Sequence, residues 1–158
     1  MFANLPFGFR VTSELPLPAD QVWERVATLE GVNAELMPWV RMTVPKHVRG
    51  LRLSDAPIGM PLFRSWILVA GCLPVDRHRF VLKEVRDGYF LETSSSWLHV
   101  LWHHERALDP VAGGCRLTDH VGFRPRVIVL GRLVLPVVRW IFAHRHRRLE
   151  SWARSPRR

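Results

Sequence analysis

The chain has 158 residues, of which 47% are hydrophobic and 23% charged, so it is long enough for one globular domain and too apolar to be disordered. Residues 124–158 hold ten arginines and one acid, which accounts for the whole net charge of +9 and leaves the remainder neutral. A neutral body argues against a nucleic-acid-binding domain, which usually carries its basic residues on a folded face, so we expect no nucleic-acid partner.

The first half of the chain predicts one strand and two helices. Apolar side chains alternate over Phe7–Leu15, which predicts a strand, and Leu-Pro-Leu-Pro ends it. Apolar residues at i, i+4 and i+7 predict a helix over 18–29, and Gly31 is expected to end it. A short second helix over Val32–Met37 ends before Pro38, because proline pushes the preceding residue out of the helical region.

The rest of the chain predicts strands and a final long helix. The strands are expected at Trp39–Val44, Leu62–Ala70, Arg79–Val85, Tyr89–Ser95, His99–Leu108 and Cys115–Arg124. The last helix runs over about Val127–Trp152, with a kink near Pro136. This order predicts an α+β fold in which one strongly curved antiparallel sheet wraps around the C-terminal helix.

Three segments resemble the START/birch-pollen-allergen-like (SRPBCC) superfamily. They are Leu15–Trp23, with Leu-Pro-x-Pro-Ala-x-x-Val-Trp, Trp102–Arg106, with Trp-His-His-Glu-Arg, and Leu117–Phe123, with Leu-Thr-Asp-His-Val-x-Phe. The resemblance implies the helix-grip fold, with about seven strands around an apolar cavity, in residues 1–152, followed by a basic tail at 153–158. That superfamily includes lipid carriers and polyketide cyclases, so the resemblance implies a small hydrophobic ligand, or alternatively an aromatase/cyclase-like reaction.

The hairpin formed by the last two predicted strands suggests which residues line such a cavity. If Leu108 lies opposite Cys115, the register places His104 opposite Asp119, on the face whose other side chains are apolar. We therefore expect the ligand-binding residues to be those that point inward from neighbouring strands: Phe90, Glu92, Trp102, His104, Arg106, Asp119, Val121 and Phe123, with Trp66 from an earlier strand.

The charged members of this set allow three interpretations. Glu92, His104, Arg106 and Asp119 can form a satisfied buried ion network, or a polar floor that orients a carbonyl or hydroxyl group of a ligand. In an enzyme, His104, Asp119 or Glu92 would be the group that transfers a proton. We expect neither a cofactor nor a metal, because His103 and His104 point to opposite faces of a strand.

Residues outside the hairpin carry weaker signals. Trp39 and Trp97 are expected to fill the core or, alternatively, to line the cavity, whereas Glu35 and Arg64 are expected at the mouth of the cavity or on the solvated surface. The segment Arg145–Arg148 is expected to surround the last helix with charge. It can be a solvated face or a contact with an anionic membrane.

Cysteine usage and the chain start predict a cytoplasmic protein. Cys72 and Cys115 form no CxxC motif, and the start shows neither the charged nor the long apolar region of a signal peptide. The most apolar stretch, Val127–Phe142, is interrupted by Arg132 and Arg139, so no membrane span is expected.

Overall fold

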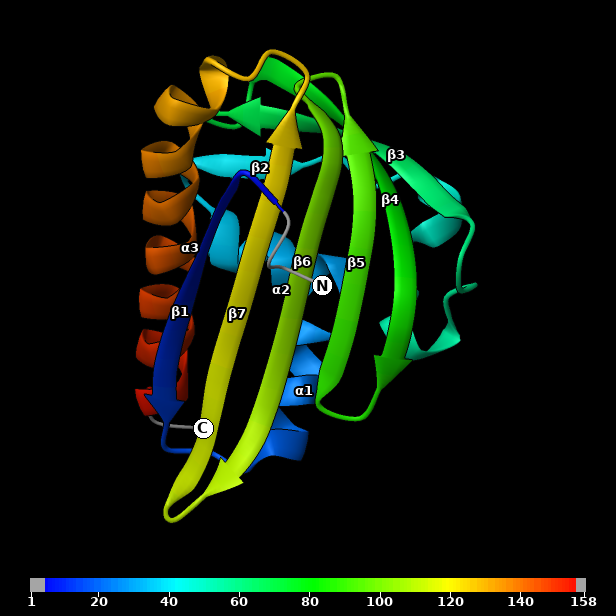
Figure 1. Ribbon diagram of the computed structural model, residues 1–158. Coiled ribbons are helices and arrows are strands. Elements are labelled where there is room, and N and C mark those ends of the chain that lie inside the picture. Colours follow the sequence, from blue (N-terminus) through cyan, green and yellow to red (C-terminus); the bar gives the residue numbers. More distant parts are fainter. Residues whose placement is uncertain (1–4, 156–158) are drawn as a thin grey trace.

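The computed structural model describes residues 5–155, in which seven antiparallel strands form one curved sheet in the order β1-β7-β6-β5-β4-β3-β2 (Figure 1). The strands are β1 (Phe7–Leu15), β2 (Val40–Met42), β3 (Pro61–Val69), β4 (Leu73–Arg86), β5 (Tyr89–Ser96), β6 (His99–Val111) and β7 (Gly114–Pro125). The helices are α1 (Ala19–Val26), α2 (Leu29–Leu36) and α3 (Leu130–Arg154), with 3-10 turns η2 (Lys46–Val48) and η3 (Leu53–Asp55). This arrangement confirms the predicted α+β helix-grip fold.

The boundary between the first two helices differs from the prediction. α1 ends at Val26, and the side chain of Thr28 caps α2 by accepting a hydrogen bond from the backbone N–H of Gly31 at 3.0 Å. Gly31 therefore lies inside α2 instead of ending a helix. A Cβ atom there would lie 1.9 Å from the carbonyl oxygen of Arg25, so the glycine permits a close approach of the α1 backbone.

The β6–β7 hairpin has a different register from the predicted one. Leu108 lies opposite Leu117 instead of Cys115, because the strands continue until Val111 faces Gly114 and the loop is tighter than expected. The other inward pairs move likewise: Arg106 with Asp119, His104 with Val121, and Trp102 with Phe123. A shift of two residues keeps every side chain on its predicted face, so the inward set itself survives.

Two apolar clusters fill the concave side of the sheet. The larger one packs α1, the start of α2 and the end of α3 against the sheet, and includes Val22, Leu82 and Leu149. The smaller one lies under the first half of α3; its buried members are Val121, Val138 and Phe142, and the apolar side chains packed against it are half-buried. The core is therefore thicker toward the α1 end than toward the start of α3.

The long C-terminal helix lies along β1 and β7 (Figure 1). It starts at Leu130, three residues later than predicted, contains Pro136, and continues to Arg154. Residues 156–158 of the expected basic tail lie outside the described residues. Among residues 5–155, no helix combines the length and the apolar character that crossing a bilayer requires.

Candidate functional site

A network of buried charged and polar side chains lies between the two apolar clusters, and Asp119 on β7 is its centre. The carboxylate has no solvent exposure. Oδ1 accepts hydrogen bonds from Arg106 Nε at 2.8 Å and His104 Nε2 at 2.9 Å, and Oδ2 accepts from Arg106 Nη2 at 2.7 Å and His146 Nε2 at 2.9 Å. Because four donors occupy its two oxygens, Asp119 has no lone pair directed at an incoming substrate.

Arg106 joins the sheet to the helices. Its Nη1 donates to Glu35 Oε1 on α2 at 2.9 Å, and Nη2, which also donates to Asp119, donates to Glu35 Oε2 at 3.0 Å. Arg145 Nε on α3 donates to Glu35 Oε2 at 2.9 Å. Glu35 is 1% exposed. The prediction of a solvated or mouth position for Glu35 is therefore wrong, and so is the exposed position expected for Arg145. Two bidentate contacts give Arg106 the geometry in which guanidinium pairs are strongest.

The network continues across the sheet to β4. His104 Nδ1 lies 3.6 Å from Glu92, whose other oxygen lies 2.6 Å from His78 Nε2. The three buried carboxylates of the network therefore meet two arginines and three imidazole rings, and each carboxylate has at least one of these groups within 3 Å.

The charged neighbours in the network lower the pKa values of its three acids. Burial raises the pKa of Asp119, but Arg106 and His104 outweigh this effect and hold that pKa well below its usual value. Burial likewise opposes ionisation of Glu35 and Glu92, yet Arg106 lowers the pKa of Glu35 and His78 lowers that of Glu92. An acid with a depressed pKa is a weak base, so the geometry argues against the expected alternative in which Asp119 or Glu92 abstracts a proton.

Ser13 and His146 extend the network to β1 and α3. Ser13 Oγ lies 2.8 Å from His146 Nδ1, and His146 Nε2 donates to Asp119. These residue types also occur in nucleophilic triads, but all three side chains are buried and Asp119 is shared with Arg106. We interpret this array as structural.

A second polar cluster lies at the start of β6, beside the smaller apolar cluster. The Ser96 hydroxyl lies 3.1 Å from His99 Nδ1, and the carboxylate of Asp76 lies 3.8 Å from the same nitrogen. His99 is 5% exposed, and its Nε2 is buried without a hydrogen-bond partner among the described residues. The His99 ring packs against Trp102 and Phe123, with centroids 5.5 and 5.1 Å away.

Aromatic rings line this part of the concave side. Trp102 stacks on Phe123 with centroids 6.0 Å apart and lies 6.4 Å from Phe142, which in turn contacts His104 at 5.0 Å. Trp102 is half-buried. We call the rings of Trp102, Phe123, Phe142 and His99 the aromatic half of the grip, and two of them, Trp102 and Phe123, pack directly against the ring that carries the unpartnered nitrogen.

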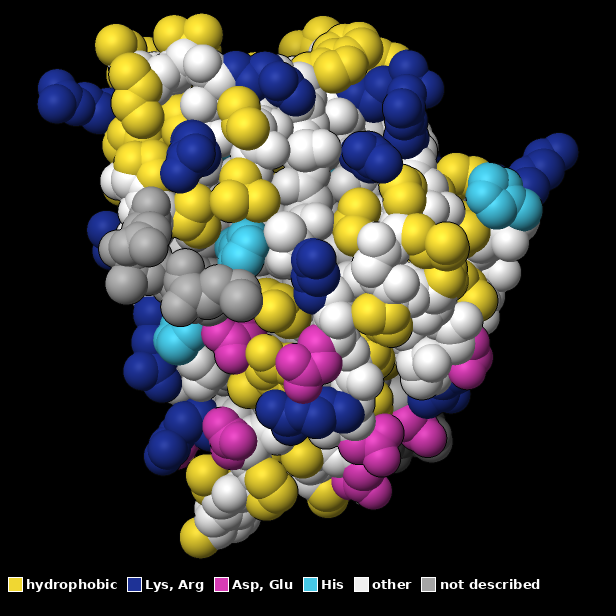
Figure 2. All heavy atoms as spheres, turned by 45° about the vertical axis from the view of Figure 1, so that its right-hand side comes forward, with side chains coloured by type: hydrophobic (Ala, Val, Ile, Leu, Met, Phe, Trp, Pro, Cys, Tyr) yellow, Lys and Arg dark blue, Asp and Glu magenta, His cyan; other side chains and the backbone are white. Residues whose placement is uncertain are grey.

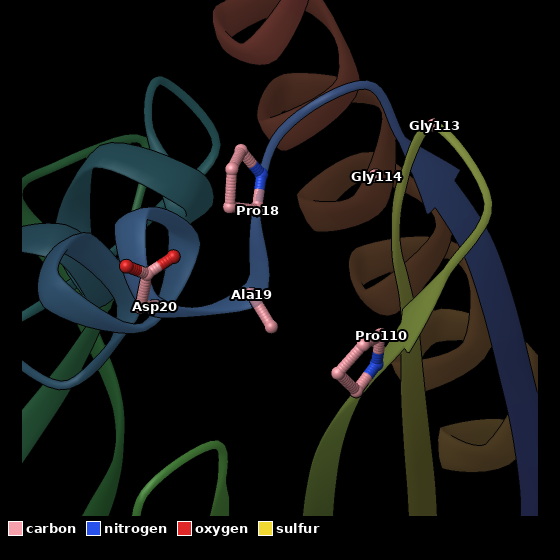
Figure 3. Close-up of a pocket in the computed structure, with 6 residues that line it drawn as sticks. All are labelled: Pro18, Ala19, Asp20, Pro110, Gly113 and Gly114. Carbon is pink, nitrogen blue, oxygen red and sulfur yellow. The ribbon is translucent and has the colours of Figure 1, made fainter.

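Two cavities stand out on the described part of the molecule, and neither is lined by the predicted ligand-binding residues. The larger, of about 490 Å³, lies between the start of α1 and the β6–β7 hairpin, where Ala19 and Pro110 face each other (Figure 3). The other, of about 260 Å³, lies between α2 and the end of α3, and Arg25 and Arg148 line it. Both open at the rim of the fold.

The structure brings most of the predicted site residues together but separates Trp66 from them. Phe90 packs on His104 at 5.0 Å, and Val121 belongs to the smaller apolar cluster. Trp66 pairs across the strands with Arg77, on the face opposite to that of His78, and its ring contacts Trp97 at 4.9 Å. The expectation of core positions for Trp39 and Trp97 is wrong, since 52% and 60% of these residues are exposed.

Sequence reasoning missed several network members. His146 and Arg145 lie on the buried stripe of α3 with Phe142 and Leu149, so the helical period alone could have located them. His78 alternates with Phe80 on β4 and was detectable in the same way. Glu35 offered no such signal, because its helix is only eight residues long.

Comparison with known proteins assigns the chain to a family. A family model described as "Domain of unknown function (DUF8410)" matches residues 13–153. No curated protein matches the chain significantly.

Among solved structures, protein CV1439 from Chromobacterium violaceum superimposes with a TM-score of 0.72 at 14% identity, covering 96% of this chain and 100% of that one. A START superfamily protein from Mycobacterium smegmatis gives 0.64 at 10% identity, covering 92% and 96%. DynU16, from the dynemicin biosynthetic locus, gives 0.59 at 17% identity, covering 90% of this chain and 47% of that one. These likenesses confirm the START-like fold expected from the sequence.

Proposed function

Because the chain belongs to the DUF8410 family, whose description names no activity, we propose a function from the geometry: the protein binds a small hydrophobic molecule in the aromatic half of the grip. The ligand class is a lipid, a polyketide or another ring-containing metabolite. The observation that carries the proposal is the buried Nε2 of His99, which has no hydrogen-bond partner among the described residues and lies beside Trp102 and Phe123.

An unpartnered buried nitrogen is costly, because the water it loses on folding is not replaced. A ligand with a hydroxyl or carbonyl group at His99 supplies the missing partner, while its apolar part contacts Trp102 and Phe142. The smaller apolar cluster has few fully buried members, so side chains there can move aside at lower cost than in the larger cluster. Half-buried Trp102 is the side chain that we expect to move.

The buried ion network has a structural part in this proposal. It joins β1, β4, β5, β6 and β7 to α2 and α3, so it holds the walls of the grip at a constant separation. Glu92, His104, Arg106 and Asp119 then act as the floor beneath the ligand. The cyclase-like alternative requires a proton acceptor. Asp119 is poorly suited to that role, because its two oxygens already accept four hydrogen bonds.

The exposed, unpaired Cys72 is compatible with a cytoplasmic carrier.

Native mass spectrometry of the freshly purified protein tests the proposal. We expect a non-covalent adduct of a few hundred daltons that disappears under denaturing conditions. The variant His99→Phe keeps a ring in place but removes the nitrogen, and should bind the recovered molecule about five- to tenfold more weakly. Trp97→Phe, at an exposed tryptophan of the same end, is the matched control and should leave affinity unchanged. Equal affinities of wild type and His99→Phe would contradict the placement of the ligand.

A further inference from the structure

One end of the molecule exposes an unusual number of large apolar side chains. They come from the β3–β4 turn, the β5–β6 turn, the β7–α3 connection and the first turns of α3, and the most exposed are Leu73, Trp97, Val127, Val129, Leu133 and Val137. These connections share one end because neighbouring strands are antiparallel. We call this surface the apolar end. Figure 2 shows it at the top, with hydrophobic side chains in yellow.

The solvent-facing side of α3 is apolar in the first half of the helix and polar in the second half. Val129, Leu133, Val137 and Trp140 lie within about 80° of one another on a helical wheel, opposite the buried stripe that includes Phe142. Val129 and Leu133 are each 68% exposed. From residue 144 onward the same side carries histidine, arginine and serine. The outer face of a solvated helix is normally polar along its whole length. Three apolar turns therefore indicate that another molecule covers this part of α3.

The exposed charges in the segments that form the apolar end are all positive. Exposed arginines flank it on β2, at and just after the end of β7, and on α3: Arg41, Arg124, Arg126, Arg132 and Arg139. Asp76 is the acid in the segments that form this end (37–42, 66–79, 96–102 and 124–140), and it is buried, with its carboxylate accepting backbone N–H groups of Arg77 and Leu98. On the face shown in Figure 2, acidic side chains appear only in the lower half.

We propose that the apolar end is a docking surface for an anionic lipid bilayer. Apolar side chains and half-exposed tryptophans enter the interfacial region, and the flanking arginines contact lipid phosphates. Trp39 and Trp140 contribute as a pair, with ring centroids 5.8 Å apart. The surface differs from the basic segment Arg145–Arg148 that the sequence suggested for membrane contact, since Arg145 is buried against Glu35.

The combination of arginines and apolar side chains favours an anionic bilayer over the other macromolecules that could cover this end. A symmetric dimer would place the same patch on both partners, so arginines would face arginines across the interface. A nucleic acid would satisfy the arginines but leave Leu133, Trp97 and their neighbours without apolar partners. An anionic bilayer complements both features at once. The aromatic half of the grip lies beneath this end, because His99 directly follows the β5–β6 turn.

Vesicle co-sedimentation tests the proposal without any knowledge of the ligand. Wild-type protein should sediment with phosphatidylcholine vesicles that contain about 30% phosphatidylglycerol, much less with phosphatidylcholine alone, and less as salt rises to about 0.5 M. The double variant Val129→Glu/Leu133→Glu should bind at least about tenfold more weakly. Removing one arginine, as in Arg132→Gln, should weaken binding about fivefold.

A matched control separates position from charge. Ile58→Glu/Met60→Glu introduces the same two charges at residues that are 51% and 54% exposed, just before β3 and away from the apolar end. This variant should bind anionic vesicles nearly as well as wild type, and circular dichroism should show both variants folded. The proposal is overturned if wild type ignores anionic vesicles, or if the two double variants bind equally. Sedimentation without vesicles gives the oligomeric state. The proposal is also overturned if wild type is a dimer, only Val129→Glu/Leu133→Glu dissociates it, and neither of these two proteins binds vesicles.

Discussion

Replacing Asp119 by asparagine tests the buried network directly. The carboxylate receives four hydrogen bonds of 2.7 to 2.9 Å, two of them from Arg106, and both residues are fully buried. Asparagine is nearly the same size, so it leaves no cavity. Its amide N–H₂ replaces one oxygen, so donors then point at donors, and Arg106 keeps only Glu35 as a counter-ion. Breaking a buried ion pair in this way costs about 3–5 kcal/mol.

That cost is large compared with the total stability of a domain, which is about 5–15 kcal/mol. If the dependence of the free energy of unfolding on urea is about 2 kcal/mol per M, the unfolding midpoint of Asp119→Asn should fall by about 2 M. Urea unfolding followed by circular dichroism measures this shift. The control is Glu14→Gln, which breaks an exposed 3.0 Å pair with Arg116 and should cost less than about 1 kcal/mol. Equal midpoints for the two variants would refute the account of the network.

Acid unfolding provides a second readout of the same groups. The pKa values of Glu35, Glu92 and Asp119 lie below their ordinary values of 4.5 and 3.8, so the unfolded chain takes up protons first as the pH falls. The stabilisation is therefore complete above about pH 5 and is lost below it, with a maximum slope of about 4 kcal/mol per pH unit for three protons. Asp119→Asn should reduce that slope by about one third. An unchanged slope would show that Asp119 is not ionised in the folded protein.

Three further predictions concern single residues. Gly31→Ala should destabilise the protein by about 1–3 kcal/mol, because its Cβ would meet a backbone oxygen of α1 at 1.9 Å. This clash outweighs the higher helix propensity of alanine. A melting temperature equal to or above that of wild type would contradict this prediction. Cys72 is exposed, whereas Cys115 is buried and burial raises its pKa, so a thiol reagent should modify one cysteine in the native protein and two in denaturant. Partial burial and the nearby Glu105 raise the pKa of Tyr89 to about 12. Since Tyr89 is the only tyrosine, absorbance titration reads it alone, and Glu105→Gln should shift the midpoint downward.

The sequence was sufficient to predict the order of elements and the face to which most strand residues point. Both depend on local periods: alternation in β7 separates Leu117 and Val121 from Arg116, and prolines and glycines mark the connections. The same periodicity correctly placed His104, Arg106 and Asp119 on one inward face, although the register was wrong by two residues. A shift of two residues leaves the face unchanged, so this error did not disturb the predicted set.

The tertiary structure decided which charges meet. Glu35 pairs with Arg106, 71 residues away, and with Arg145, 110 residues away. No local pattern encodes such a pairing, because an isolated helix has no reason to prefer a buried over a solvated glutamate; the preference arises only when two guanidinium groups arrive from a strand and another helix. The apolar end is similar. Trp97 and Leu133 look like core residues in the sequence, and only the packed fold shows that their neighbourhood lacks a covering element, because burial depends on what the rest of the chain places above them.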